Sequence, residues 1–374
     1  MRPNANVSSI APRAVGAFGA WCRGLGIAGI VGVVAACSSA PPASGTSSTG
    51  TTPASTAADS APAPTAASSS PVPPIKIGIA LGGGAAKGFA HIGVIKMLEA
   101  NGFAPVVVSG TSAGSVVGAL YAGGMSAFEL QEKAVALDEA SIRDLQFSSG
   151  GVVLGQRLED YVNEQVRRQP LERLPKPFVA VATRLEDGER TVFTRGNTGQ
   201  AVRASSSVPG VFQPVAIGKY HFVDGGVVSP VPVDAARQLG ADMVIAVDIS
   251  SKARGQTPGD MLGTLSQSIT IMGQKLGQAE LARADVIVRP QVLDIGAADF
   301  TQRANAILEG EKAAMAAMPQ IRARVAQLQA EREQATRVAQ QKATEAQRQA
   351  CLEQRSTLRK LTDMARMDVV CPVP

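Results

Sequence analysis

A serine between two glycines, placed where a predicted strand meets a predicted helix, is the feature that most constrains the fold. Residues 105–110, PVVVSG, form an apolar run typical of a buried strand, and residues 115–124, SVVGALYAGG, favour a helix. The GTSAG segment at 110–114 joins them, and its glycines permit a sharp turn that lifts the Ser112 side chain above a sheet. The N-terminus of the following helix favours negative charge that develops beside the serine. Ser112 is therefore a candidate nucleophile rather than only a turn residue.

Strands and helices alternate through the middle of the chain. The other apolar segments that predict strands lie at 75–81, 178–185, 243–249 and 284–290, with helical segments between them. This alternation predicts an α/β sandwich with a largely parallel sheet. With 374 residues, of which 45% are apolar, the chain has enough apolar surface for one main core plus appendages.

The base that would activate Ser112 is not obvious, because the chain contains only two histidines, His91 and His221. His221 lies three residues before Asp224 on a predicted short strand, so the two side chains would point to opposite faces. Asp224 is the better candidate, since the two glycines after it let the backbone turn close to a reacting group. A Ser-His-acid triad that uses His221 is the alternative.

A glycine-rich loop, LGGGAAKGFAH at 81–91, follows the first predicted strand. It does not match the Walker order, because Lys87 precedes Gly88, and Lys87 also occupies the place of the third glycine in G-x-G-x-x-G. Its bare backbone N–H groups at a helix N-terminus are suited to an oxyanion. The expected oxyanion-hole donors are the N–H groups of Gly83, Gly84, Ala85 and Ala113.

Taken in chain order, these motifs resemble those of the patatin-like phospholipase family, over about residues 75–300. The nucleophile motif is GTSAG at 110–114, the dyad motif is DGG at 224–226, and ASSSVP at 204–209 matches a block between them. The oxyanion motif is GGGAAKG at 82–88. The glycines that frame these motifs are Gly82, Gly88, Gly110, Gly114, Gly225 and Gly226.

The resemblance implies a patatin-like three-layer sandwich and a Ser-Asp dyad, in which Asp224 activates Ser112 without a histidine. It also implies a lipid acyl hydrolase that cleaves a membrane lipid or lysophospholipid and uses no metal or cofactor. The alternative from another class is a non-catalytic, lipid-binding envelope lipoprotein. No sequence feature specifies an oligomeric state.

The N-terminal 74 residues predict a signal followed by a tether. Residues 1–36 contain basic residues and then an apolar run too short to span a bilayer stably, and they resemble a bacterial lipoprotein signal. This resemblance implies cleavage before Cys37, its lipidation, and attachment to the bacterial outer membrane facing the periplasm. A retained membrane helix and a plain secretory signal are the alternatives. Residues 37–74, nearly all Ala, Ser, Thr and Pro, cannot bury apolar surface and predict a tether that holds the domain near a lipid surface.

The formal net charge of +5 does not argue for a nucleic-acid partner, because three of the arginines lie in the predicted signal.

The C-terminal region, residues 301–374, predicts a mostly solvated helix that is separable from the hydrolase domain at 75–300. Ile321, Val325 and Leu328 have helical spacing before the apolar content declines, and a coiled coil or partner-binding helix is the alternative. Cys351 and Cys371 are the two cysteines left in an exported chain, which favours a disulfide between them over two free thiols.

Overall fold

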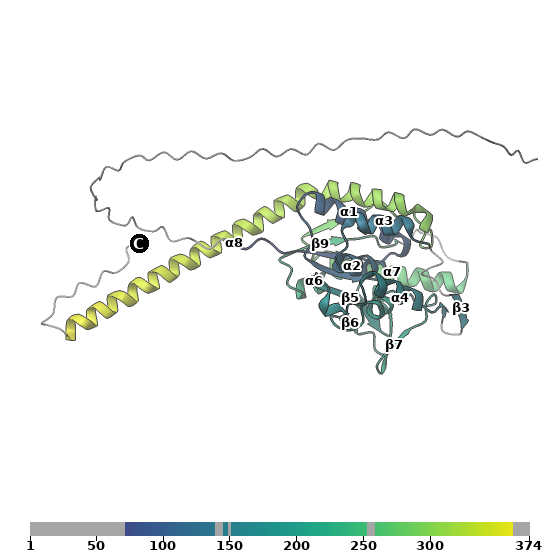
Figure 1. Cartoon of the computed structure of the whole chain (residues 1–374), viewed down its shortest axis with the longest axis horizontal. Coiled ribbons are helices and arrows are strands. Elements are labelled where there is room, and N and C mark those ends of the chain that lie inside the picture. The colour runs from purple at the N-terminus through teal and green to yellow at the C-terminus, as the bar shows by residue number, and fades with distance from the viewer. Residues whose placement is uncertain (1–71, 139–144, 149–150, 253–258, 362–374) are drawn as a thin grey trace, which may run out of the picture. The chain divides into compact units, whose positions relative to one another are not determined.

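The computed structural model describes residues 72–138, 145–148, 151–252 and 259–361 (Figure 1). The predicted signal at 1–36, Cys37, nearly all of the predicted tether and Cys371 lie outside these ranges, so the predictions made for them stay predictions. Within the described ranges, no helix is both long and apolar enough to cross a membrane.

Ten strands form two sheets among the described residues. They are β1 (Ile77–Leu81), β2 (Val107–Thr111), β3 (Leu145–Ser148), β4 (Gly151–Val153), β5 (Phe178–Arg184), β6 (Arg190–Phe193), β7 (Val215–Ile217), β8 (Tyr220–Asp224), β9 (Met243–Val247) and β10 (Val286–Val288). The main, eight-stranded sheet has the order β10-β9-β1-β2-β5-β8-β7, with β6 also paired to β5. The first five strands in this order, β10, β9, β1, β2 and β5, are parallel to one another, whereas β6, β7 and β8 pair antiparallel. A separate two-stranded sheet joins β3 to β4.

The helices connect these strands. The α-helices are α1 (Ala90–Ala100), α2 (Ala113–Ala122), α3 (Ala127–Ala136), α4 (Gln156–Gln165), α5 (Thr198–Ser205), α6 (Val233–Gln238), α7 (Met261–Leu281) and α8 (Arg303–Leu361). Short 3-10 helices are η1 (Ala85–Phe89), η3 (Leu171–Arg173), η4 (Gly225–Val227) and η5 (Phe300–Gln302). All the strands expected from the sequence are present, and the glycine-rich loop continues into η1.

Helices cover both faces of the main sheet, because successive strand residues point to opposite sides. On β1, Ile79 and Leu81 face a core built with α1, α2 and α8. Ala80, between them, faces a second core that includes residues of α6 and the end of α7. The predicted three-layer α/β sandwich with a largely parallel sheet is therefore confirmed.

The first part of α8 belongs to this core, which corrects the domain boundary expected at residue 300. Ile307, Ala314 and Ile321 are buried there. The helix packs closely on α1 through two glycines, since a Cβ on Gly93 would lie 2.0 Å from the Ile307 carbonyl oxygen and one on Gly310 equally close to that of Ala90. The sequence suggested a solvated tail because its average composition is polar, although its early apolar residues form a buried stripe.

The second part of α8 does match the expectation of a solvated helix. Most of its residues from 333 to 357 are exposed, and Figure 1 shows α8 continuing past the elements that its first part contacts. Cys351 takes part in a disulfide bond, while Cys371 lies outside the described residues, so their pairing stays a prediction.

Candidate active site

Ser112 lies in a strained turn between β2 and α2. Its backbone has φ 54° and ψ −126°, a left-handed φ that residues other than glycine rarely adopt, and its side chain is only 7% exposed. Such strain is kept only where the surrounding structure enforces it, and it often marks a functional residue. The sequence prediction of a sharp turn that presents Ser112 is confirmed.

Hydrogen bonds fix this turn from both sides. The Ser112 N–H donates to Ser205 Oγ at 2.9 Å, and the Ser205 hydroxyl donates to the Val181 carbonyl oxygen at 2.6 Å. The Ser115 hydroxyl donates to the Ser112 carbonyl oxygen at 2.7 Å. Ser205 had no individual role in the sequence analysis, although it belongs to the ASSSVP block. It connects the nucleophile turn to α5 and β5.

Asp224 ends β8, separated from the end of β2 by the single strand β5. Val181 of β5 pairs with Thr111, and the next residue, Ala182, pairs with Asp224. This register places the ends of β2 and β8 at the same level of the sheet, and the Asp224 carboxyl group interacts with the Ser112 hydroxyl, so the two residues lie together as expected.

The Asp224 carboxyl group is buried and incompletely hydrogen-bonded. Its Oδ1 accepts the Gly226 N–H at 2.6 Å, whereas Oδ2 is buried with no hydrogen-bond partner of ordinary geometry. Burial raises the pKa of Asp224 to about 6, and interactions with the Ser112 hydroxyl and the Gly226 N–H partly oppose this rise. The Asp224 carboxyl group therefore lies beside the serine and has one oxygen, Oδ2, that no other group binds.

Two short segments meet at the serine with unused N–H groups. Within the described residues, the N–H groups of Gly84, Ala85 and Ala113 donate no hydrogen bond. The N–H of Gly83, expected as a fourth donor, instead donates to the Pro230 carbonyl oxygen at 3.0 Å. Three of the four predicted donors are therefore free to bind an oxyanion.

Steric contacts explain why the loop has glycines at positions 83 and 84. A Cβ on Gly83 would lie 3.2 Å from Ser112 Cβ, so the missing side chain at 83 keeps the loop close to the nucleophile. A Cβ on Gly84 would lie 2.7 Å from Ile249 Cδ1, and the φ of 172° at Gly84 is ordinary extended backbone. Gly84 is thus required for packing against Ile249.

The other motif glycines allow close backbone contacts. A Cβ on Gly114 would lie 2.1 Å from the Leu81 carbonyl oxygen, and one on Gly225 would lie 2.1 Å from the Val181 carbonyl oxygen. Comparable contacts within 3.0 Å restrict Gly82, Gly88, Gly110 and Gly226. These glycines bring the three motifs together around Ser112.

The two histidines have very different environments. His91 is fully buried, its Nε2 donates to the Gly82 carbonyl oxygen at 2.8 Å, and burial lowers its pKa to about 4. It is therefore neutral and holds the glycine-rich loop, a role that the sequence analysis did not assign. His221 has a side chain that is 56% exposed and bonds Glu186 at 2.9 Å, so it lies outside the group around Ser112. The structure gives the alternative His221 triad no support.

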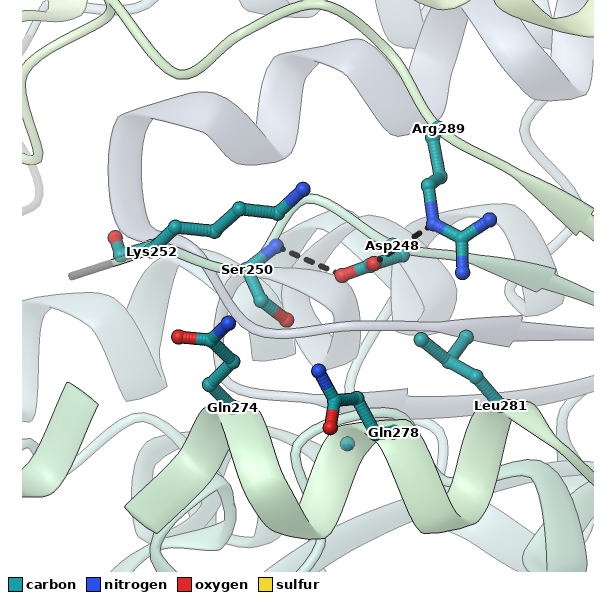
Figure 2. Close-up of a pocket in the computed structure, with 9 residues that line it drawn as sticks. Asp248, Ser250, Lys252, Gln274, Gln278, Leu281 and Arg289 are labelled. Atoms are coloured by element: carbon teal, nitrogen blue, oxygen red, sulfur yellow. Dashed lines mark hydrogen bonds and ion pairs between the residues drawn. The ribbon is translucent and has the colours of Figure 1, made fainter. Parts of the chain in front are cut away.

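A pocket of about 150 Å³ lies at the carboxyl ends of β9 and β10, beside the glycine-rich loop (Figure 2). Ser251, in its wall, accepts a hydrogen bond of 2.5 Å from Nζ of the buried Lys87. Asp248 accepts hydrogen bonds from the Ser250 N–H and from Arg289 Nε, and Figure 2 shows Gln274 and Gln278 projecting toward the pocket from α7. The sequence analysis did not detect this pocket. Among the described residues, no three His, Cys, Asp or Glu side chains form a group that could hold a metal ion.

Comparisons with known proteins agree with these motifs. The family model described as patatin-like phospholipase matches residues 79–237. An uncharacterized NTE family protein of Mycobacterium tuberculosis is 36% identical over 183 residues, which cover 48% of this chain and 51% of the relative. Human patatin-like phospholipase domain-containing protein 6 is 33% identical over 184 residues, which cover 47% of this chain and 13% of that protein. The chain thus spans about half the length of the mycobacterial relative and a smaller part of the human one.

Solved structures also show similarity to this chain. VipD from Legionella pneumophila aligns with a TM-score of 0.45 and 16% identity, over 65% of this chain and 66% of that chain. The ExoU–SpcU complex from the type III secretion system of Pseudomonas aeruginosa aligns with a TM-score of 0.38 and 18% identity, over 76% of this chain and 64% of that chain.

Proposed function

The chain belongs to the patatin-like phospholipase family, with residues 79–237 as the matching domain, and on this premise we propose that it is a serine acyl hydrolase of lipids. The proposed reaction is hydrolysis of the carboxylic ester of a membrane phospholipid or lysophospholipid. Ser112 is the nucleophile and Asp224 is the base. No step requires a metal or a cofactor.

The proposed reaction has two halves that share the same base. Ser112 Oγ attacks the ester carbonyl carbon while its proton passes to Asp224 Oδ2, and the N–H groups of Gly84, Ala85 and Ala113 stabilise the oxyanion. The intermediate collapses, and the leaving alcohol takes the proton from Asp224. Water then attacks the carbonyl carbon of the acylated serine and gives a proton to Asp224. The bond between that carbon and Ser112 Oγ breaks, Asp224 returns the proton to Oγ, and the free fatty acid leaves.

The buried, unpartnered Oδ2 of Asp224 beside Ser112 is the observation that carries this proposal. An aspartate with an ordinary pKa of about 3.9 is a weak base at neutral pH. Burial raises the pKa of Asp224 to about 6, so the carboxylate is a stronger base and is still mostly ionised at neutral pH. A group used only for structure would be expected to have both oxygens paired.

Single and double substitutions test the dyad on a soluble p-nitrophenyl ester. We expect Ser112→Ala and Asp224→Asn each to lower kcat by at least about 10³-fold, and the double variant to be no slower, because both groups act as one unit. His221→Ala, the control, should keep its activity. Partial losses that add up in the double variant would contradict the dyad, and a large loss in the His221 variant alone would favour the triad.

A fluorophosphonate probe separates hydrolysis from mere lipid binding. We expect the probe to label the wild-type chain at Ser112 and to leave Ser112→Ala unlabelled. We also expect wild type, but not Ser112→Ala, to release free fatty acid from a bacterial lipid extract. A folded wild-type chain that forms no Ser112-dependent adduct would instead support the non-catalytic, lipid-binding alternative.

We also propose that Cys37 carries a lipid that anchors the enzyme in the bacterial cell envelope, at the outer membrane facing the periplasm. The lipoprotein-like signal before Cys37 and the tether after it support this placement. We expect Cys37→Ser to abolish lipid attachment and to lower the fraction of the protein that stays with the membrane after a salt wash. Wild-type membrane retention of the variant would contradict the anchor.

A further inference from the structure

Helix α7 exposes an unusual number of apolar side chains. Of the fifteen large apolar side chains that are exposed among the described residues, five lie on this one helix: Met261, Leu265, Ile271, Met272 and Leu276. Four of them, Met261, Leu265, Met272 and Leu276, are spaced by four, seven and four residues. Such spacing places them on one side of a helix, where they form a continuous row that we call the α7 stripe.

The opposite side of α7 contacts the loops of the candidate active site. Gly273 lies near the Gly226 carbonyl oxygen, which a Cβ at 273 would approach to 3.5 Å, and Gly277 lies against Pro230. Figure 2 shows Gln274 and Gln278 directed into the pocket beside the glycine-rich loop. Near these loops the inward side of the helix is therefore formed by small and polar residues, and only its end, at Leu281, packs into the second core.

Glu280 attaches the end of α7 to the same loops. This buried carboxylate accepts hydrogen bonds from the Ser229 hydroxyl at 2.5 Å and from the Val231 N–H at 2.8 Å. Between these two residues, the Pro230 carbonyl oxygen accepts the N–H of Gly83. Helix α7 is thus connected to the glycine-rich loop through a single peptide segment.

A normal surface helix buries its large apolar side chains, whereas α7 leaves the four residues of the α7 stripe exposed to solvent. We propose that the α7 stripe is a docking surface for a lipid bilayer, which places the Ser112–Asp224 site against the membrane that contains its substrate. This inference rests on the proposed lipid hydrolase function. It adds to that function the surface through which an insoluble substrate reaches the site.

The charges on α7 favour a lipid surface over other occupants. The helix carries one basic residue, Lys275, which is exposed, and one acidic residue, Glu280, which is buried on the inward side. An exposed face that is apolar and basic complements the anionic surface of a bacterial bilayer, and no acidic side chain of α7 would be repelled by it.

The size of the stripe also argues against a second copy of the chain. A stable protein interface buries about 800 Å² on each partner, which is more than a row of four side chains can supply. A helix that lies in the interfacial region of a bilayer needs only its apolar side chains to insert between the lipids.

Binding to lipid vesicles tests the α7 stripe. The parent protein for this test has neither a lipid anchor nor hydrolase activity. All variants carry Cys37→Ser, so that no lipid anchor contributes, and Ser112→Ala, so that the vesicles are not hydrolysed. The test variant adds Leu265→Gln, Met272→Gln and Leu276→Gln, because glutamine keeps the helix propensity of these residues. The control adds Val338→Gln and Leu352→Gln, which are comparably exposed apolar positions on α8.

Binding is measured by co-sedimentation with vesicles of phosphatidylcholine containing one fifth phosphatidylglycerol. We expect the test variant to bind at least about tenfold more weakly than the parent protein, and the control to bind equally well. Lys275→Gln should weaken binding about fivefold on these vesicles and not on pure phosphatidylcholine. Unchanged binding of the test variant would overturn the proposal. The proposal would also be overturned if the protein were a dimer in solution, and if the test substitutions made it a monomer without weakening its binding to vesicles.

Activity measurements keep this result separate from the proposed function. With Ser112 restored, the test variant should hydrolyse a soluble p-nitrophenyl ester at the rate of the control, which also shows that it is folded, but should hydrolyse vesicle lipids at least about tenfold more slowly. Equal rates on vesicles would count against docking. Absence of soluble-ester hydrolysis in the wild-type chain would count against the hydrolase function and would leave the binding result to stand by itself.

Discussion

Two regions of the molecule bury their side chains in different ways. Where α8 packs against the rest of the domain, buried side chains are apolar and charged ones form ion pairs. Around Ser112 and Asp224, at the active-site edge of the sheet, some buried polar atoms have no partner. Ile307 and Ile321 of α8 are buried, and Arg324 of the same helix pairs with Asp285 at 2.9 Å. At the active-site edge, the three buried side-chain polar atoms that lack partners within the described residues lie on residues of the sequence motifs or beside them. They are Asp224 Oδ2, His91 Nδ1 and Ser206 Oγ.

This difference separates burial that stabilises the fold from burial that prepares a reaction. Buried polar groups are normally hydrogen-bonded, because an unpaired one costs about 1–3 kcal/mol. A chain tolerates that cost, together with the strained backbone of Ser112, where the unpaired atom has another use. Four predictions test whether the two regions really differ in this way, in order of decreasing effect.

The largest effect should distinguish two buried carboxylates. Asp224→Asn removes the free acceptor, and we expect kcat on a soluble ester to fall about 10⁴-fold. Glu280 is also buried, but both of its oxygens accept hydrogen bonds, so we expect Glu280→Gln to change kcat by less than about tenfold. Equal losses in the two variants would mean that burial, and not the unpaired oxygen, sets the activity.

Truncation of α8 should separate its two parts. Ending the chain after Pro319 removes the fully buried Ile321 and the ion pair of Arg324, and we expect about 3–5 kcal/mol less stability in urea unfolding. This corrects the expectation that the whole tail is separable. Ending the chain after Gln341 removes residues 342–357, which are mainly exposed, and also the disulfide of Cys351, so both chains are compared in reducing buffer, where this truncation should cost less than about 0.5 kcal/mol. Similar unfolding midpoints for both truncations would show that the α8 interface contributes little.

Gly84→Ala tests the glycine-rich loop. The added Cβ would meet Ile249, so the loop must move and displace the N–H groups of Gly84 and Ala85, with an expected loss of about 10²–10³ in kcat. Gly259→Ala is the matched control, because its Cβ would have no neighbour within 4 Å. If Gly84→Ala left both turnover and folding unchanged, the loop would have only a structural role.

The pH dependence of stability should reveal the cost of the buried Asp224. Because its pKa is raised to about 6 in the folded state, the native protein binds the proton more tightly than the unfolded chain between about pH 4 and pH 6. The contribution of Asp224 to the free energy of unfolding therefore falls by up to about 3 kcal/mol as pH rises through this window. Asp224→Asn should remove this pH dependence.

The measurement is the difference in unfolding free energy between wild type and Asp224→Asn across the pH range. A difference is needed because His91, whose pKa burial lowers to about 4, contributes the opposite slope in both proteins. A difference that does not change with pH would show that the folded-state pKa of Asp224 is ordinary. Activity should have the reverse dependence and fall below about pH 6, because the reaction needs the carboxylate.

The sequence by itself predicted the five parallel strands, the helices that alternate with them, the turn at Ser112 and the choice of Asp224 as its base. These follow from local patterns: an apolar run predicts a buried strand, and glycines on both sides of a residue predict a sharp turn. The choice of Asp224 over His221 needed the two-residue repeat of a strand together with the two glycines that follow Asp224. The predicted oxyanion donors came from the same kind of reasoning, and three of the four have a free N–H.

Only the tertiary structure decided which side chains hold these motifs in place. Ser205 bonds the Ser112 N–H from 93 residues away, and His91 supports the carbonyl oxygen of Gly82 from within the core. Gly83 lost its expected role because the Pro230 carbonyl oxygen, which comes from a distant segment, accepts its N–H. Ile321, in a helix whose average composition is polar, is likewise buried because α8 packs into the core that also contains residues of α1. Such contacts join residues far apart in the chain, and a local pattern of amino acids carries no record of which distant group will lie opposite it.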